Sequence, residues 1–119
     1  MRHWTLRLIT MLFLNAAASQ LLAADTASLK FWNTTAETIT ELYLAPAGTS
    51  AWSANLCLTD QDHAVDPDER LSLPGITGGS YEVRVVDKRG RKCLFHDLRL
   101  SGAGHYAFAL SEEQMASCH

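Results

Sequence analysis

Hydrophobic and polar residues alternate in short runs along most of the chain, the pattern of strands with one buried face. Six such runs are separated by polar or glycine-containing connections: 29–33, 38–45, 70–73, 81–86, 93–100 and 106–110. Short strands at fairly even spacing are typical of β-sandwiches and small barrels. We therefore expect an all-β fold, a small antiparallel β-sandwich of about six to seven strands, either Ig-like or a partly open barrel. The alternation slips between Ile39 and Leu42, which predicts a β-bulge or a strand buried on both sides.

A β-hairpin over residues 81–100 is the clearest local prediction. Arg89-Gly90 offers a two-residue turn, in which glycine accepts the positive φ of a type I′ turn. This turn sets the register of the apolar face, with the pairs Val85–Leu94, Val83–His96 and Tyr81–Leu98. In that register the opposite face carries a solvated row of charges: Glu82, Arg84, Asp97 and Arg99.

The first 24 residues have the order of a secretory signal peptide. Arg2 and Arg7 precede an apolar run over residues 8–14, and small residues follow up to Ala24. Polar residues interrupt the apolar segment, which is too short for the roughly 20 residues of a spanning helix. We expect residues 1–24 to be removed, with cleavage after Ala24 or alternatively after Ala18. Residues 25–119 then form one domain, periplasmic or secreted, with no membrane span.

Charge excludes two classes of partner. The formal net charge is −3, and removal of the two signal-peptide arginines leaves 8 basic against 13 acidic residues, or −5. A sequence-independent nucleic-acid binder needs a basic stripe, and binding to an anionic membrane needs a polybasic patch. The mature chain has neither feature, so we expect no nucleic acid as a partner.

Three cysteines lie in the mature chain: Cys57, Cys93 and Cys118. In an oxidising compartment we expect two of them to pair and one to stay free. A Cys57–Cys93 bond would close a loop worth about 3–4 kcal/mol in the chain-entropy description. A Cys93–Cys118 bond would instead hold the C-terminal tail on the domain, and the spacing slightly favours it. The third cysteine is then a small buried hydrophobic residue.

Two groups of residues have donor atoms for metal ions. Cys93, His96, Cys118 and His119 offer thiolate and imidazole donors suited to copper or zinc. Cys93 and His96 would point to opposite faces of an extended strand, which favours a disulfide over a shared metal. The loop 60–69 has five carboxylates that could collect around calcium, but it lacks the glycine and glutamate of an EF-hand in register. We expect it to be a solvated loop.

The sequence contains no convincing catalytic group. Ser80, His96 and Asp97 have the atoms of a triad, but adjacent strand residues point to opposite faces, so Asp97 could not orient His96. We expect His96 to lie on the apolar face as a core or edge histidine. Trp32 and Trp52 are candidate binding residues, because exposed aromatic side chains often anchor interfaces. Trp32 is the better candidate for exposure, and we expect Trp52 to cap one end of the sandwich.

Most of residues 28–100 resembles a widespread family of small exported bacterial proteins of unestablished function. The matching segments are 33–39, 42–46, Trp52, 55–56, 73–75, 78–79, 81–87 and 97–98. The resemblance implies a compact antiparallel β domain without a catalytic motif. Family members often have a disulfide whose two cysteines would fall at Ser80 and Arg99, so this chain departs from the family there.

We therefore expect an exported, non-enzymatic module that binds a protein or another envelope component, or associates structurally with it. The alternative is a periplasmic metal-binding protein that uses the cysteine and histidine donors.

Overall fold

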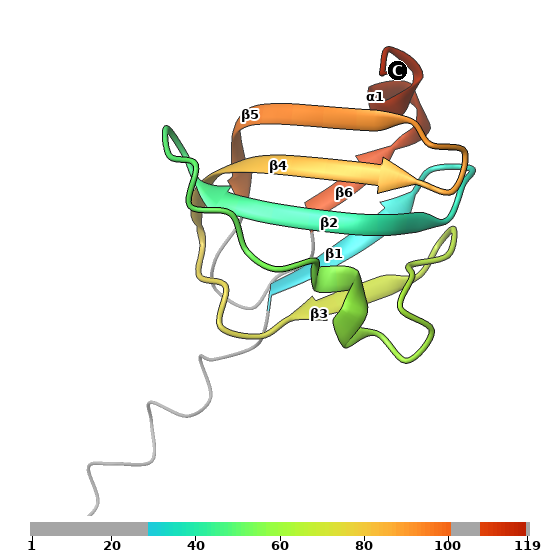
Figure 1. Cartoon of the computed structure of the whole chain (residues 1–119), viewed down its shortest axis with the longest axis horizontal. Helices are drawn as coiled ribbons and strands as arrows, with labels where there is room; N and C mark the ends of the chain where they lie inside the picture. The colour runs from blue at the N-terminus through green and yellow to red at the C-terminus, as the bar shows by residue number, and fades with distance from the viewer. Residues whose placement is uncertain (1–28, 101–107, 119) are drawn as a thin grey trace, which may run out of the picture.

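The computed structural model describes residues 29–100 and 108–118, which form six strands in two three-stranded sheets (Figure 1). The order in one sheet is β3-β1-β6 and in the other β2-β4-β5. The strands are β1 (Leu29–Thr34), β2 (Ile39–Pro46), β3 (Arg70–Leu73), β4 (Gly79–Asp87), β5 (Lys92–Leu100) and β6 (Phe108–Ser111). A 3-10 helix η1 (Leu56–Thr59) and a helix α1 (Glu112–Ala116) complete the described chain.

This architecture confirms the predicted all-β fold. One detail differs from the expected antiparallel pairing, because β1 and β6 run parallel and the β3-β1-β6 sheet is therefore mixed. The predicted signal peptide, 1–24, lies outside the described residues. Within the part of the chain that the structure describes, no helix is both long enough and apolar enough to cross a bilayer.

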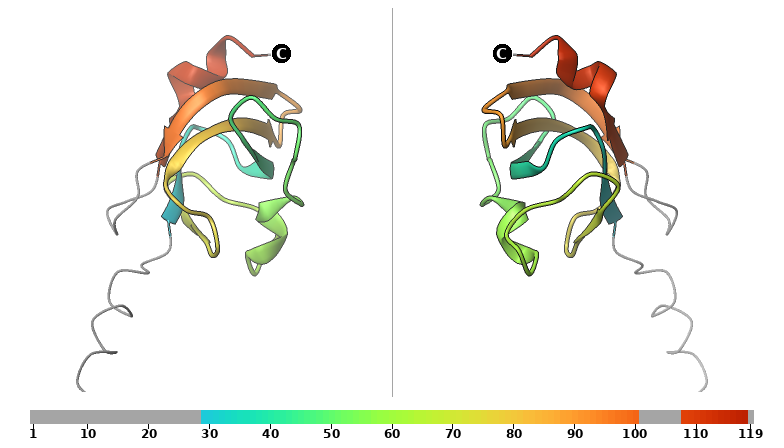
Figure 2. Two further views of the ribbon diagram at one scale, coloured as in Figure 1. Left: turned by 90° about the vertical axis from the view of Figure 1, so that its left-hand side faces the viewer. Right: turned by 90° about the vertical axis from the view of Figure 1, so that its right-hand side faces the viewer.

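The apolar faces of the two sheets enclose one core. Phe31 of β1, Leu42 of β2 and Val83 of β4 are completely buried in it, and Met115 of α1 reaches it from the C-terminal end. Figure 2 shows the strands curving around this interior, with α1 at one edge beside β5. The predicted irregularity in β2 is confirmed as a register shift between Ile39 and Glu41, which turns both Ile39 and Leu42 inward.

The turn between β4 and β5 has three residues, not the predicted two. Gly90, at φ 85°, donates its N–H to the Asp87 carbonyl, and the Asp87 N–H is donated to the Arg91 carbonyl. This is a type I turn followed by a glycine in the left-handed region. The buried carboxylate of Asp87 stabilises the turn by accepting both the backbone N–H and the Nε–H of Arg91, at 2.9 and 2.6 Å.

Because of the extra turn residue, the side chains in the first half of β5 point to the opposite faces from those predicted. Val85 lies opposite Cys93, and Val83 opposite Phe95, so the predicted pairs Val85–Leu94 and Val83–His96 are wrong. A bulge at Asp97, which has φ 53°, then restores the predicted Tyr81–Leu98 pair. A shift of one residue exchanges the two faces of a strand, so Cys93 is buried and Leu94 is 51% exposed.

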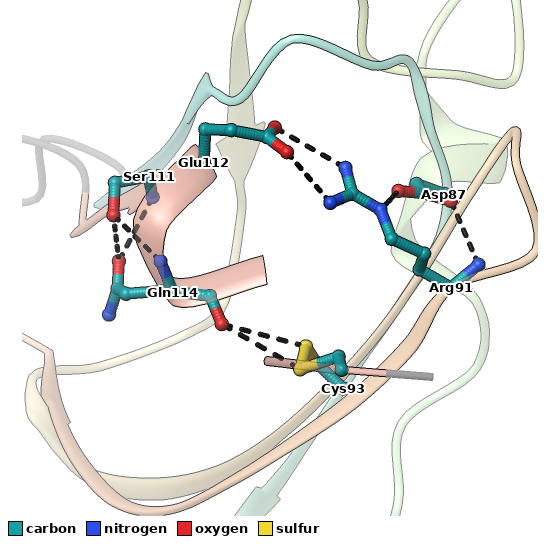
Figure 3. The surroundings of a disulfide bond; sticks show 7 residues. Asp87, Arg91, Cys93, Ser111, Glu112 and Gln114 are labelled. Carbon is teal, nitrogen blue, oxygen red and sulfur yellow. Dashed lines mark hydrogen bonds and ion pairs between the residues drawn. A yellow bond between two sulfur atoms is a disulfide. The ribbon is translucent and has the colours of Figure 1, made fainter. Parts of the chain in front are cut away.

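Because the Cys93 side chain points into the core, it can form a disulfide with Cys118, with the two Cα atoms 5.3 Å apart (Figure 3). This is the pairing that holds the C-terminal tail on the domain. Ser111 caps α1 by accepting the Gln114 N–H, while the Gln114 side chain accepts the Ser111 N–H. Cys57 is free and fully buried, as expected for a small core residue.

Candidate functional site

Three side chains form a row across the face of the β2-β4-β5 sheet that is turned away from the core. Tyr43 of β2 is the register partner of Arg84 of β4, and Arg84 is the register partner of Leu94 of β5. Directly opposite residues share one face, with Cβ atoms about 5 Å apart. We call this side of the sheet, with Tyr43, Arg84, Leu94 and Trp52, the outer face.

Arg84 lies against two aromatic rings. Its guanidinium carbon is 4.6 Å from the centroid of the Tyr43 ring and 5.0 Å from that of the Trp52 ring. Neither ring belongs to the core cluster. Among the residues that the structure describes, no carboxylate forms an ion pair with Arg84 and no acceptor takes a hydrogen bond from its guanidinium. The aromatic contacts therefore hold the guanidinium while its N–H groups stay available.

Trp52 reaches this face because the loop 47–55, which contains it, is hydrogen-bonded along the edge of β2. The Ser53 N–H is donated to the Leu44 carbonyl at 2.8 Å, and the Ser53 hydroxyl accepts the Leu44 N–H. The side-chain amide of Asn55 accepts the Leu42 N–H and donates to the Thr40 carbonyl, as a strand backbone would. The loop thus closes this sheet edge and places Trp52 over Arg84. We expected Trp52 to cap one end of the sandwich, but it lies against Arg84 on the outer face.

Glu82 holds the loop and β5 together beside the row. One of its oxygens accepts the Gly48 N–H at 3.0 Å, and the other lies 2.6 Å from Nδ1 of His96. The Gly48 N–H, followed by the His96 contact, lowers the pKa of the Glu82 carboxyl. The His96 side chain is 72% exposed, so its expected place on the apolar face is wrong. The extra residue in the β4–β5 turn places His96 on the side of β5 that faces away from the core. Its carboxylate partner there is Glu82 and not Asp97.

Tyr43 has a carboxylate partner of its own. Its hydroxyl donates to Glu41 at 2.6 Å, and this hydrogen bond raises the pKa of the Tyr43 hydroxyl above its ordinary value. Both carboxylates near the row, Glu41 and Glu82, are therefore engaged by neighbours other than Arg84.

Trp32 lies on the other sheet and does not join Trp52. The guanidinium carbon of Arg70 is 4.3 Å from its ring centroid, and its indole N–H is donated to Asp68 at 3.0 Å. Trp32 is half-buried and lies outside the core cluster. The two tryptophans that the sequence singled out thus each contact an arginine, on separate sheets.

The candidate metal donors are not brought together. Cys93 and Cys118 are joined in the disulfide, His96 faces the opposite side of β5, and His119 lies outside the described residues. Over residues 29–100 and 108–118, no group of three or more histidine, cysteine or acidic side chains could hold a metal ion.

In the loop 60–69, the carboxylates cap turns of the loop and its neighbours. Asp60 accepts the Asp62 N–H, and Glu69 accepts the Asp66 N–H. Asp66 also accepts a hydrogen bond from the hydroxyl of Thr38. These contacts give Asp60, Asp66 and Glu69 hydrogen-bond partners within the protein.

Sequence reasoning placed Arg84 on the solvent side of its strand but did not identify it as the centre of a cluster. Its partners come from β2, from β5 and from the loop 47–55, and only the sheet register brings them together. Comparison of the chain with protein-family models, curated proteins and solved structures finds no match in any of the three. The residues of the outer face therefore carry the functional proposal.

Proposed function

We propose that this protein is an exported, non-enzymatic binding module of the cell envelope, and that it binds its partner on the outer face. One observation carries the proposal: Arg84 is held against Tyr43 and Trp52, yet its N–H groups have no acceptor among the described residues. Arginine, tryptophan and tyrosine are the residue types most enriched in the energetic centres of protein interfaces.

Leu94 extends this surface with an apolar contact. It is one of two large hydrophobic side chains in the described chain that are mostly exposed, the other being Leu58 at 57%. A single exposed leucine is ordinary, but Leu94 lies in the same cross-strand row as Arg84. A partner on the outer face would therefore bury apolar area and also satisfy the arginine.

Two further features support export and binding. The order of residues 1–24 is that of a signal peptide, and disulfides such as Cys93–Cys118 persist mainly in oxidising compartments. The His96–Glu82 pair receives no hydrogen bond from a serine or cysteine among the described residues, which supports binding over nucleophilic catalysis.

Site-specific photo-crosslinking tests the proposed face. A photoreactive amino acid replaces Leu94 in one variant and Leu58 in a control variant, because both positions are exposed and lie on different elements. The variants are expressed in the cells that naturally produce the protein, and adducts are compared after irradiation. We expect a discrete adduct from position 94 and little from position 58. Equal adducts at both positions, or none at 94, would contradict the proposal.

A further inference from the structure

We infer that the partner of the outer face is a protein segment that places a carboxylate on Arg84 and an aliphatic side chain on Leu94. This inference rests on the proposed function and specifies the chemistry of the partner. Its basis is a charge that the row leaves unmatched and the apolar residue directly beside that charge.

Arg84 is the uncompensated charge of the row. The carboxylate of Glu41 accepts the Tyr43 hydroxyl, and that of Glu82 is shared between Gly48 and His96. Arg91, by contrast, is satisfied by two carboxylates of its own. A planar guanidinium with available N–H groups recognises a carboxylate through two parallel hydrogen bonds, and stacking on aromatic rings fixes its orientation.

The single positive charge of Arg84 is matched by a single negative charge on the partner. Glu41 and Glu82 flank the row on neighbouring positions of β2 and β4, but each already accepts hydrogen bonds from neighbours other than Arg84. A carboxylate offers one charge and the two acceptor atoms that fit a guanidinium through two parallel hydrogen bonds. We therefore assign a carboxylate to Arg84, and the phosphoserine peptide described below tests this assignment.

The spacing of Arg84 and Leu94 also restricts the partner. They are direct register partners on one face, so their Cβ atoms are separated by about 5 Å. In an extended segment, side chains two residues apart point the same way at a distance of about 7 Å. A segment that crosses the strands with an acidic residue and an aliphatic residue two positions apart would reach both groups.

A protein fits this surface better than a small molecule does. The row consists of side chains on the face of a sheet, whereas small-molecule sites are typically concave and enclose most of the ligand. In the other aromatic–arginine contact, Arg70 lies against one ring, that of Trp32, whereas Arg84 lies against two. Neither mostly exposed leucine lies on the strands of that sheet.

Selection of displayed random peptides on the purified exported protein tests the inference. We expect enrichment of peptides in which Asp or Glu lies two residues from Leu, Ile or Val. A synthetic copy of an enriched peptide should bind Arg84→Gln at least ten times more weakly than the unsubstituted protein, because charge-assisted hydrogen bonds are lost. Arg99→Gln is the matched control, since Arg99 is an exposed arginine near the opposite end of β5 from Leu94. This substitution should change the affinity less than twofold.

The peptide provides the second half of the test. A peptide with the amide in place of its acidic residue should bind the unsubstituted protein at least ten times more weakly than the acidic peptide does. Arg84→Gln should bind the amide and acidic peptides equally. A phosphoserine in its place should bind less tightly than the acid. No enrichment of acidic peptides, equal losses in Arg84→Gln and Arg99→Gln, or tighter binding of the phosphoserine peptide would each overturn the inference. If the crosslink from position 94 persists in such a case, the proposed function stands and only the partner chemistry is wrong.

Discussion

Arg91 donates to the carboxylate of Glu112, with Nη1 and Oε1 2.7 Å apart, and so joins the β4–β5 turn to the first residue of α1 (Figure 3). The second oxygen of Glu112 also accepts the Ala36 N–H at 2.9 Å. Arg91 reaches back to Asp87 through Nε at 2.6 Å. One glutamate therefore connects three segments that are far apart in the sequence: the turn, the β1–β2 connection and α1.

This relationship predicts a stability that depends on acid pH. The hydrogen bonds from Arg91, followed by that from Ala36, lower the pKa of Glu112 from its ordinary 4.5 to about 2. A carboxyl with a lowered pKa in the folded state stabilises fully above its unfolded pKa, and the stabilisation is lost as the pH falls through the folded pKa. We expect the free energy of unfolding to fall between pH 5 and pH 2, and to fall less in Glu112→Gln. Urea unfolding at several pH values measures this, and Glu113→Gln, at the exposed neighbour, should follow the unsubstituted protein.

The disulfide should contribute a large part of the stability. Cys93 and Cys118 are separated by 25 residues, and closing a loop of that length stabilises by about 3.5 kcal/mol in the chain-entropy description. We expect Cys118→Ser to lower the free energy of unfolding by about this amount, and a reducing agent to lower it similarly in the unsubstituted protein. Ser117→Ala, at the exposed preceding residue, should change it by less than about 0.5 kcal/mol. A loss in Cys118→Ser no greater than in this control would refute the prediction.

Cys57 should react only after unfolding. Its thiol is fully buried, and burial, with smaller effects from Asp60, Glu41 and Glu69, raises its pKa to about 12. Since the thiolate is the reactive form, we expect negligible labelling of the native protein by a thiol reagent at pH 8. In denaturant without reductant, one thiol per chain should be labelled. Rapid native labelling, or three labelled thiols, would be inconsistent with this structure.

Asn33 should be intolerant of the isosteric change to aspartate. It is completely buried and donates to the carbonyls of Glu37 and Val65, both at 2.8 Å. Its side-chain oxygen accepts from the N–H and hydroxyl of Thr35. Asn33→Asp would bring a buried carboxylate against two carbonyls.

We expect this change to cost about 3 kcal/mol or more at pH 7. The cost should shrink as the pH falls, because the protonated acid can donate one of the lost hydrogen bonds. Asn55→Asp is the control, since Asn55 is only half-buried and would lose one donated hydrogen bond. Chemical unfolding at pH 4 and pH 7 measures both, and an equal cost in the two variants would argue against the buried network.

Ser80 and Arg99 are direct register partners on β4 and β5. Opposite positions in an antiparallel pair place the Cβ atoms close to the spacing of a disulfide. We expect the double substitution Ser80→Cys and Arg99→Cys to form a second bond under oxidising conditions. Mass spectrometry of peptides should find it together with Cys93–Cys118, and persistence of two extra free thiols would show that the register differs.

The local pattern was sufficient for the strands but not for their register. Alternation identified β3 with its bounds and the bulge in β2, because side-chain direction in a strand depends on neighbouring residues alone. The β4–β5 turn was misassigned even though Asp87 and Gly90 stand at the first and last positions that a type I turn favours. The register error placed Leu94 and His96 on the wrong face.

By itself, then, the sequence determined that the chain is built of short strands with one apolar face, that its N-terminus has the form of an export signal, and that two of three cysteines should pair. Only the tertiary structure decided which cysteines pair, that β1 and β6 run parallel, and that Arg84 meets Tyr43, Trp52 and Leu94. The physical reason is the range of the interactions. Strand formation depends on the alternation of nearby side chains, whereas a surface cluster depends on how several strands align, and a change of one residue in a turn moves its members to the other face.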